Sequence, residues 1–174
     1  MGRTVEIVDY DPAWPELYER GAVAIRGALA GLRLQCVHIG STAIPGLSAK
    51  AVIDILLAVE SLNELSARES GLQGLGYSAH GEFGIPGRRY YTKVGEQRTH
   101  HLHAFEFGAP EVARHIGFRD FLRESGRDAE AYAALKIRLA QQFRDDPHGY
   151  SDAKSAFIQS IDERARDRYL PKLG

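Results

Sequence analysis

The sequence predicts an α+β fold in which a mixed β-sheet is flanked by helices and followed by a helical C-terminal part. Residues 32–39 and 51–59 are apolar on both alternating faces, which is typical of strands in the centre of a sheet. From residue 110 onward, apolar residues recur at the steps of three and four that indicate helices. No repeat, linker or low-complexity segment interrupts the 174 residues, so we expect a single domain, 1–174.

The first part of the chain is expected to alternate helices with short strands. Residues 4–8 form a strand or an extended lead-in, and Asp11 caps a helix that runs to about residue 30. After the two central strands, Ser61 and Glu64 form a capping box that opens a helix ending near residue 71. A short strand is expected at 77–80.

The second part begins with a predicted hairpin and ends in helices. Its strands span 88–94 and 99–107, joined by a tight turn at 95–97. We expect helices at 110–123, at 128–143 with Asp128 as the cap, and from Ser151 onward, with breaks at Gly126 and at 145–149.

Composition excludes several classes of function. A formal net charge of −1 argues against binding of bulk nucleic acid, which needs a concentrated basic surface, whereas a small anion needs only a few local charges. No apolar run approaches the roughly 20 residues that cross a bilayer, and the N-terminus lacks the apolar segment of a signal peptide. The single cysteine, Cys36, excludes an internal disulfide. We therefore expect a cytoplasmic protein that does not associate with membranes.

The segment 38–57 carries the residues best suited to chemistry. Gly40 follows a strand and lets a ligand approach the backbone without a side chain in the way. Ser41 and Thr42 offer hydroxyl and N–H groups suited to phosphate oxygens. Asp54 is a carboxylate within the next apolar strand, where burial is costly unless the charge is paired or holds a metal. Asp54 therefore needs a partner.

This arrangement resembles the nucleotidyltransferase superfamily related to DNA polymerase beta, whose signature is Gly-Ser after a strand and a metal-binding Asp on the next strand. More closely, it resembles the GrpB family, a poorly characterised bacterial group placed in that superfamily. Similar blocks occur at 10–14, at 87–91, at 100–103 and at Tyr150 with Lys154, so the resemblance covers nearly the whole chain. It implies a nucleotidyltransferase-like mixed sheet, catalytic roles for Asp54 and Ser41, and a nucleoside triphosphate bound with Mg or Mn.

One position departs from the superfamily pattern. Its active enzymes usually carry a second carboxylate two residues after the first, on the same strand face. Leu56 occupies that position here. Because paired carboxylates hold the ions that orient the triphosphate, Leu56 puts two-metal chemistry of the usual kind in doubt.

Cationic residues supply candidates for phosphate binding. Lys136 and Lys154 lie on the apolar stripes of their helices, so each either extends to water or meets an anion. Tyr150, one turn before Lys154, is placed to bind the same ligand. Lys50 ends the Gly-Ser loop, where a solvated lysine is equally compatible. The candidates for nucleotide or phosphate binding are thus Gly40, Ser41, Thr42, Lys50, Lys136, Tyr150 and Lys154, with Arg88 and Arg89 of the basic hairpin.

Two histidines are candidates for metal binding. His101 and His103 are two residues apart on one strand face, which lets both imidazoles reach one metal. If their strand neighbours that of Asp54, the three side chains form a two-histidine, one-carboxylate site. The alternatives are histidines hydrogen-bonded within the sheet or acting as cations toward phosphate.

Three hypotheses for function remain from the sequence. The first is an enzyme that transfers a nucleotidyl group to a small acceptor, with Ser41 on the triphosphate, Asp54 on the metal, and Lys154 and Arg89 neutralising phosphate charge. The second is a non-catalytic module that binds a nucleotide or another phosphorylated small molecule, because Leu56 removes a carboxylate. The third is a metal-dependent enzyme of another class that uses Asp54, His101 and His103. A homodimer is compatible with each.

Overall fold

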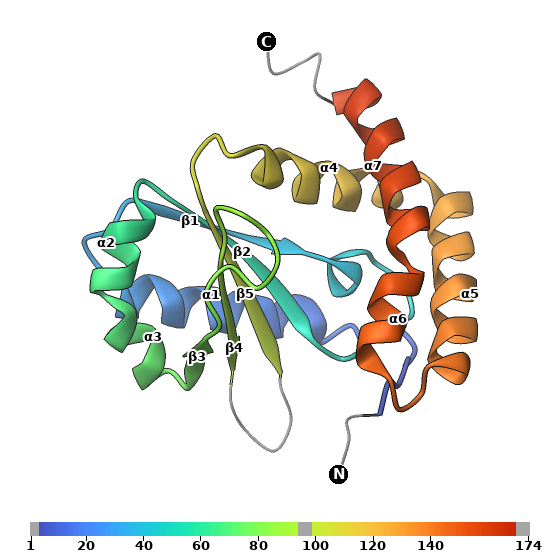
Figure 1. Ribbon diagram of the computed structural model, residues 1–174, viewed down its shortest axis with the longest axis horizontal. Helices are drawn as coiled ribbons and strands as arrows, with labels where there is room; N and C mark the ends of the chain where they lie inside the picture. The colour runs from blue at the N-terminus through green and yellow to red at the C-terminus, as the bar shows by residue number, and fades with distance from the viewer. Residues whose placement is uncertain (1–3, 94–98, 170–174) are drawn as a thin grey trace.

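The computed structural model describes residues 4–93 and 99–169 and confirms the predicted α+β class (Figure 1). Its sheet has five strands in the order β1-β2-β5-β4-β3. The β2 and β5 strands pair in parallel, and the other neighbours are antiparallel, so the sheet is mixed. The strands are β1 (Leu34–Ile39), β2 (Ile53–Val59), β3 (Tyr77–Ala79), β4 (Arg89–Lys93) and β5 (His100–Glu106).

One face of the sheet, here called the closed face, is apolar throughout its centre. The helices α1 (Trp14–Ala28), α2 (Leu62–Ala67) and α3 (Glu69–Gly74) pack into the same hydrophobic cluster as this face. The α1 helix forms because its apolar residues recur on one stripe, and Ala22 and Ile25 of that stripe are fully buried. The buried apolar residues of β2 and β5 on this face are Ile53, Ile55, Leu57, Val59, Leu102 and Ala104.

The opposite face, here called the site face, carries Asp54 and Leu56 of β2 with His101, His103 and Phe105 of β5. Helix α4 (Pro110–Glu124) packs against part of it, through Val112 and Ile116 on Leu56 and Phe105. The helices α5 (Gly126–Gln142), α6 (Pro147–Ala153) and α7 (Ser155–Tyr169) lie together at one end of the sheet (Figure 1). They are the predicted helical C-terminal part.

Three elements of the first half differ from the sequence prediction. The N-cap of α1 is Ala13, and Asp11, the predicted cap, instead accepts a hydrogen bond from the Ala13 N–H. The helix expected to end near residue 71 is two short helices, α2 and α3, which meet at Arg68. Gly71 lies inside α3, where a Cβ atom would approach the Ala28 carbonyl oxygen to 2.6 Å, so this glycine serves close helix packing and not a helix end. Residues 4–8 contribute only an isolated bridge, Val8 with Ala49.

The C-terminal helices begin at other residues than predicted. Ser125 caps α5 by accepting a hydrogen bond from the Asp128 N–H, so Asp128 lies in the first turn and Gly126 inside the helix. Asp146 caps α6, which includes Ser151, and the last helix begins only at Ser155. The predicted turn at 95–97 lies outside the described residues. None of the helices in the described part of the chain has the length and apolar character to cross a membrane.

Candidate metal and phosphate site

Asp54, His101 and His103 meet on the site face. In the parallel pairing of β2 with β5, Asp54 lies opposite His101, and His103 follows two residues later on the same face. The Asp54 Oδ1 atom is 2.9 Å from Nε2 of His103 and 3.5 Å from Nδ1 of His101. One ligand atom from each residue lies within 4.8 Å of the others. The three side chains are 27%, 24% and 13% exposed, so solvent species reach them.

Gly40 lies directly against this carboxylate. Its φ is +73°, which favours glycine, and a Cβ atom there would stand 2.7 Å from Asp54 Oδ2. Ser41 follows as the first residue of the short 3-10 helix η1 (Ser41–Ala43), and its hydroxyl hydrogen-bonds Tyr132 of α5. Arg123 of α4 donates to the Ala43 carbonyl oxygen and holds this turn in place. The Gly-Ser loop and the carboxylate therefore border one site, as predicted.

The carboxyl group of Asp54 is held in its charged form. Burial raises its pKa, but hydrogen bonds from His101 and His103 oppose burial and hold the pKa well below the usual range. Asp54 is therefore an anion at neutral pH. A charged carboxylate beside two imidazoles is a donor set suited to a divalent transition metal.

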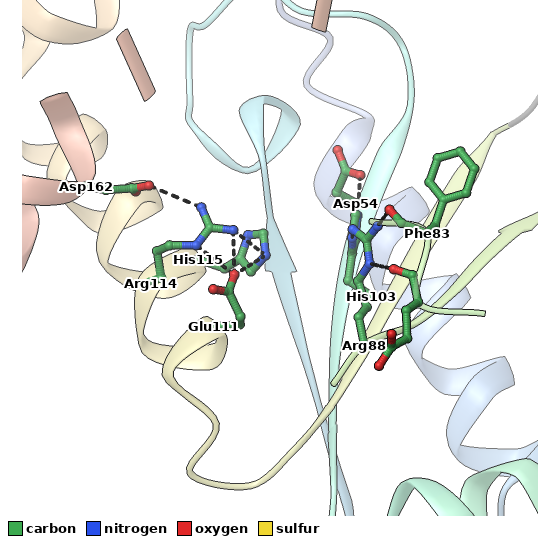
Figure 2. A network of polar contacts seen from close by, with 9 residues as sticks. Asp54, Phe83, Arg88, His103, Glu111, Arg114, His115 and Asp162 are labelled. Atoms are coloured by element: carbon green, nitrogen blue, oxygen red, sulfur yellow. Dashed lines mark hydrogen bonds and ion pairs between the residues drawn. The ribbon is translucent and has the colours of Figure 1, made fainter. Parts of the chain in front are cut away.

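A buried arginine lies behind His103 (Figure 2). Arg88 is 6% exposed, donates from Nη2 to the Phe83 carbonyl oxygen at 2.6 Å, and places Nη1 3.4 Å from Nδ1 of His103. Because a guanidinium has only donors, Nδ1 accepts, and the proton of a neutral His103 lies on Nε2, facing Asp54. A histidine that binds metal through Nε2 carries its proton on Nδ1 and donates it to an acceptor. Metal binding by His103 Nε2 therefore requires Arg88 to withdraw from Nδ1.

Helix α4 adds a cluster of polar residues that was not predicted from the sequence: Glu111, Arg114 and His115 (Figure 2). Arg114 binds Glu111 at 2.7 Å and Asp162 of α7 at 3.2 Å, and the His115 ring lies 5.7 Å from that of His103. Burial, followed by the charge of Arg114, lowers the pKa of His115 well below its ordinary value, so this imidazole is neutral. The signal in the sequence was the spacing of Glu111, Arg114 and His115 by three and four, which places them on one helix face.

The predicted lysines gather around two tyrosines at the edge of the site. Lys50 and Lys154 place their Nζ atoms 5.2 and 4.2 Å from the ring centre of Tyr150. Burial and the charge of Lys50 lower the pKa of Lys154 to about 8, while the charge of Asp54 raises it. The Tyr150 hydroxyl is buried and has no hydrogen-bond partner within residues 4–93 and 99–169. A cationic group with an unused hydroxyl is suited to an anion.

Lys136 is buried more deeply than the other two lysines. It is 2% exposed, donates to the Ser48 carbonyl oxygen at 2.5 Å and lies 4.6 Å from the ring centre of Tyr132. Burial, with the charge of Lys154, lowers the pKa of Lys136 to about 7. Its Nζ atom therefore holds the Gly-Ser loop through the Ser48 carbonyl oxygen, and its positive charge is partly lost at neutral pH.

Comparison with known proteins identifies the family. Residues 4–164 match the family model described as GrpB protein. The chain belongs to the GrpB family. The crystal structure of conserved protein GrpB from Enterococcus faecalis is 39% identical and superimposes with a TM-score of 0.90, covering 95% of this chain and 99% of that one.

Curated relatives agree with this assignment. The UPF0157 protein YqkA of Bacillus subtilis is 38% identical over 94% of this chain, which spans only 48% of YqkA. The UPF0157 protein BH1888 of Halalkalibacterium halodurans is also 38% identical, with 93% of this chain and 83% of BH1888 covered. A dephospho-CoA kinase of Mycolicibacterium paratuberculosis is 26% identical over 94% of this chain and 46% of the kinase.

Two predicted ligand residues of this GrpB-family chain lie elsewhere. The Thr42 side chain is 2% exposed and its hydroxyl is 2.9 Å from Nε2 of His38, so this hydroxyl is buried within the loop and engaged by the histidine. Arg89 shares a face of β4 with Tyr91, whereas Tyr90 pairs with His103 on the site face. Arg89 therefore points to the opposite side of the sheet from Asp54. Leu56 is fully buried against Ile39 and Phe105, so no carboxylate stands at that position.

Proposed function

We propose that this GrpB-family protein binds a nucleoside triphosphate together with a divalent metal and transfers a nucleotidyl group to a small acceptor. The observation that carries the proposal is the convergence of three ligand atoms, from Asp54, His101 and His103, within 4.8 Å of one another. They lie beside Gly40, where the absence of a side chain allows the Asp54 carboxylate to lie directly against the backbone.

The donor set fits a divalent cation held by Asp54, His101 and His103. A metal there would neutralise charge on the phosphate chain and orient it for displacement. Two imidazole nitrogens with one carboxylate favour manganese or a later transition metal over magnesium, which prefers oxygen ligands. Of the two metals expected from the sequence, manganese is the better match. Arg88, which faces Nδ1 of His103, opposes this ligation until it moves.

The phosphate chain would lie between the Gly-Ser turn and the lysines. Ser41 is the first residue of η1. Lys50, in the loop before β2, and Lys154, at the C-terminal end of α6, both approach the Tyr150 ring. Lys136, with its pKa lowered to about 7, would carry a full charge only if a bound anion stabilised its protonated form. Protein groups that reduce repulsion among phosphate oxygens and fix their position account for much of the catalysis in such transfers.

A second function, binding without turnover, is favoured by Leu56. Its burial leaves Asp54 as the carboxylate of β2 on the site face, so paired-ion catalysis lacks a ligand. The similarity to part of a dephospho-CoA kinase is compatible with an accessory domain beside a phosphate-handling enzyme. In this function, the lysines at the same site would bind a nucleotide or another phosphorylated small molecule without the help of a metal.

Calorimetric titration separates the two functions. We expect ATP, GTP, CTP or UTP to bind in Mn²⁺, binding to be lost in EDTA, and Asp54→Asn and His103→Ala to abolish it, since both remove a metal ligand. Asp145→Asn and His148→Ala, at exposed positions outside the site, are matched controls that retain binding. For a nucleotide that binds, release of pyrophosphate in the presence of an acceptor measures transfer of the nucleotidyl group.

Two results decide against the enzyme. Absence of heat and of any thermal shift with all four nucleotides and Mn²⁺ rejects nucleotide binding. Binding that persists in EDTA and survives Asp54→Asn instead supports the accessory module. Elemental analysis of the purified protein tests the remaining metal enzyme of another class, which requires bound metal.

A further inference from the structure

We propose that the exposed ring of Phe83 is the stacking surface for the base of the bound nucleotide. The inference rests on the proposed nucleotide binding and adds to it the part of the ligand that lies beyond the phosphates. It assigns a ligand-binding role to the loop 80–88, between β3 and β4, which the sequence analysis treated only as a Gly-rich connection.

Phe83 has an unusual backbone and an unusual exposure. Among residues 4–93 and 99–169 it is the one non-glycine residue with positive φ, at +46°. Its side chain is 58% exposed, although burial of aromatic rings is a main source of folding energy. Glycine would satisfy this φ without strain, so the phenyl ring costs stability at this position. A strained and exposed aromatic residue indicates a surface kept for contact with a ligand.

The loop is built to hold Phe83 in this position. Arg88 donates to the carbonyl oxygens of Phe83 and Glu82, at 2.6 and 3.0 Å, and the Glu82 side chain accepts from the Gly87 N–H at 2.8 Å. These bonds fix the backbone on both sides of the phenyl ring. The arginine that fixes the ring also contacts His103, so the ring and the candidate metal site share one support (Figure 2).

Tyr90 links the Phe83 ring to the site. The rings of Phe83 and Tyr90 stack with centroids 5.1 Å apart and an interplanar angle of 22°. The Tyr90 ring in turn lies 5.6 Å from that of His101 and 5.2 Å from that of His103. Tyr90 therefore covers one face of Phe83 and His80 approaches it at a tilt, with ring centres 5.9 Å apart, while the 58% exposure of Phe83 leaves area for another ring.

The order of strands places these groups along one line. Ser41 follows β1, Asp54 is on β2, the histidines are on β5, and Tyr90 is on β4, next to the Phe83 loop. Because neighbouring strands are about 4.8 Å apart, Asp54 and Tyr90 are separated by about two such spacings, roughly 10 Å. In the proposed complex, the phosphate chain lies between Ser41, Lys154 and the metal at Asp54. The base at its other end then points toward β4 and Phe83.

The test compares a ligand that has a base with one that has none. ATP and inorganic tripolyphosphate, each with Mn²⁺, are titrated into the wild-type protein, Phe83→Gly and Phe83→Trp. We expect Phe83→Gly to bind ATP about tenfold more weakly, in line with the value of one base–aromatic stack, and tripolyphosphate as the wild type does. Its melting temperature should be unchanged or higher, because glycine relieves the positive φ.

Phe83→Trp should retain ATP affinity, and ATP should quench the fluorescence of the introduced indole, which tripolyphosphate should not. The native Trp14 is 2% exposed and gives a separate, ligand-independent signal. Phe107 is another exposed phenylalanine and directly follows the last residue of β5, so Phe107→Gly serves as the control. It should leave both affinities unchanged.

Unchanged ATP affinity in Phe83→Gly overturns the stacking role, as does an equal loss for ATP and tripolyphosphate. If neither compound binds the wild-type protein, the proposed nucleotide function fails, and the stacking role fails with it. Binding of both compounds with no effect of Phe83→Gly removes the stacking role alone.

Discussion

The two faces of the β-sheet are made by the same strands but have different environments. On the closed face, Ile53, Ile55 and Leu57 are at most 2% exposed and lie in one apolar cluster with α1. On the site face, Asp54 and His101 are partly exposed, and Ile39, Leu56 and Phe105 form a smaller apolar cluster with α4. One step along β2 therefore moves a side chain from a buried apolar core to a partly exposed polar cluster.

The difference comes from the covering helices. The α1 helix presents Ala22 and Ile25 to the sheet, both fully buried, and closes its face with apolar contacts. The α4 helix presents Arg114, His115 and Arg119. Arg114 bonds to His115 and Glu111, and Arg119 bonds to Asp120 and to the His38 carbonyl oxygen. This polar helix covers a face that carries Asp54, His101 and His103, and clusters of ionisable groups of this kind are candidates for functional sites.

The largest expected effect comes from placing the same polar residue on each face. Leu57→Asn on the closed face should cost about 4 kcal/mol or more, because it removes a fully buried side chain and buries an amide without a partner. Leu56 is equally buried but lies opposite His103 in the β2–β5 pairing. The amide of Leu56→Asn therefore has a polar neighbour, and this substitution should cost less by about 1 kcal/mol. Urea denaturation of both variants measures the difference, and equal costs would contradict the contrast between the faces.

A second effect concerns Lys136, beneath the site. Because burial lowers its pKa from 10.5 to about 7, the unfolded chain holds this proton over a pH range in which the folded protein has lost it. The free energy of unfolding should therefore rise between pH 7 and 10.5, by a few kcal/mol at about 1.4 kcal/mol per pKa unit.

Lys136→Met lacks this group and should show a correspondingly flatter profile. The difference between the two denaturation curves at each pH isolates Lys136 from other titrating groups. Parallel curves for the two proteins would show that Lys136 titrates as an ordinary lysine.

Two glycines of the loop between β1 and β2 provide a matched pair for a third effect. Gly40 and Gly46 have φ of +73° and +79°, but a Cβ atom meets Asp54 at 2.7 Å only at Gly40. Gly46→Ala should cost about 1 kcal/mol from backbone strain and leave ligand binding intact. Gly40→Ala should cost about 1 to 2 kcal/mol more and abolish Mn²⁺ binding, since the methyl group displaces the carboxylate. Calorimetry with Mn²⁺ and thermal denaturation distinguish the two variants.

The smallest effect concerns Arg88, which faces His103. Arg88→Gln offers an acceptor to Nδ1 of His103 and removes a positive charge, so Mn²⁺ affinity should rise about tenfold, about 1.4 kcal/mol. Arg114→Gln removes a charge near His115 but makes no bond to His103, and it should raise affinity less. Equal gains in the two variants would assign the effect to charge alone.

The meeting of Asp54 with His101 and His103 could be predicted because it depends on period-two alternation and on the two strands being neighbours. The side to which Arg89 points could not, because it depends on where β4 begins, and a shift of one residue reverses every side chain. His115 was missed because its role depends on where a distant helix packs. Thr42 looked like a ligand residue, but its hydroxyl is used by His38, on the closed face.

The parallel pairing of β2 with β5 has a consequence for how the protein is made. His103 is 49 positions from Asp54 along the chain, so the carboxylate meets its imidazoles only after the strand that carries them has docked. A nascent or partly unfolded molecule offers a metal no such trio. Any metal bound there would favour the finished fold by mass action, and its retention would report that the sheet is complete.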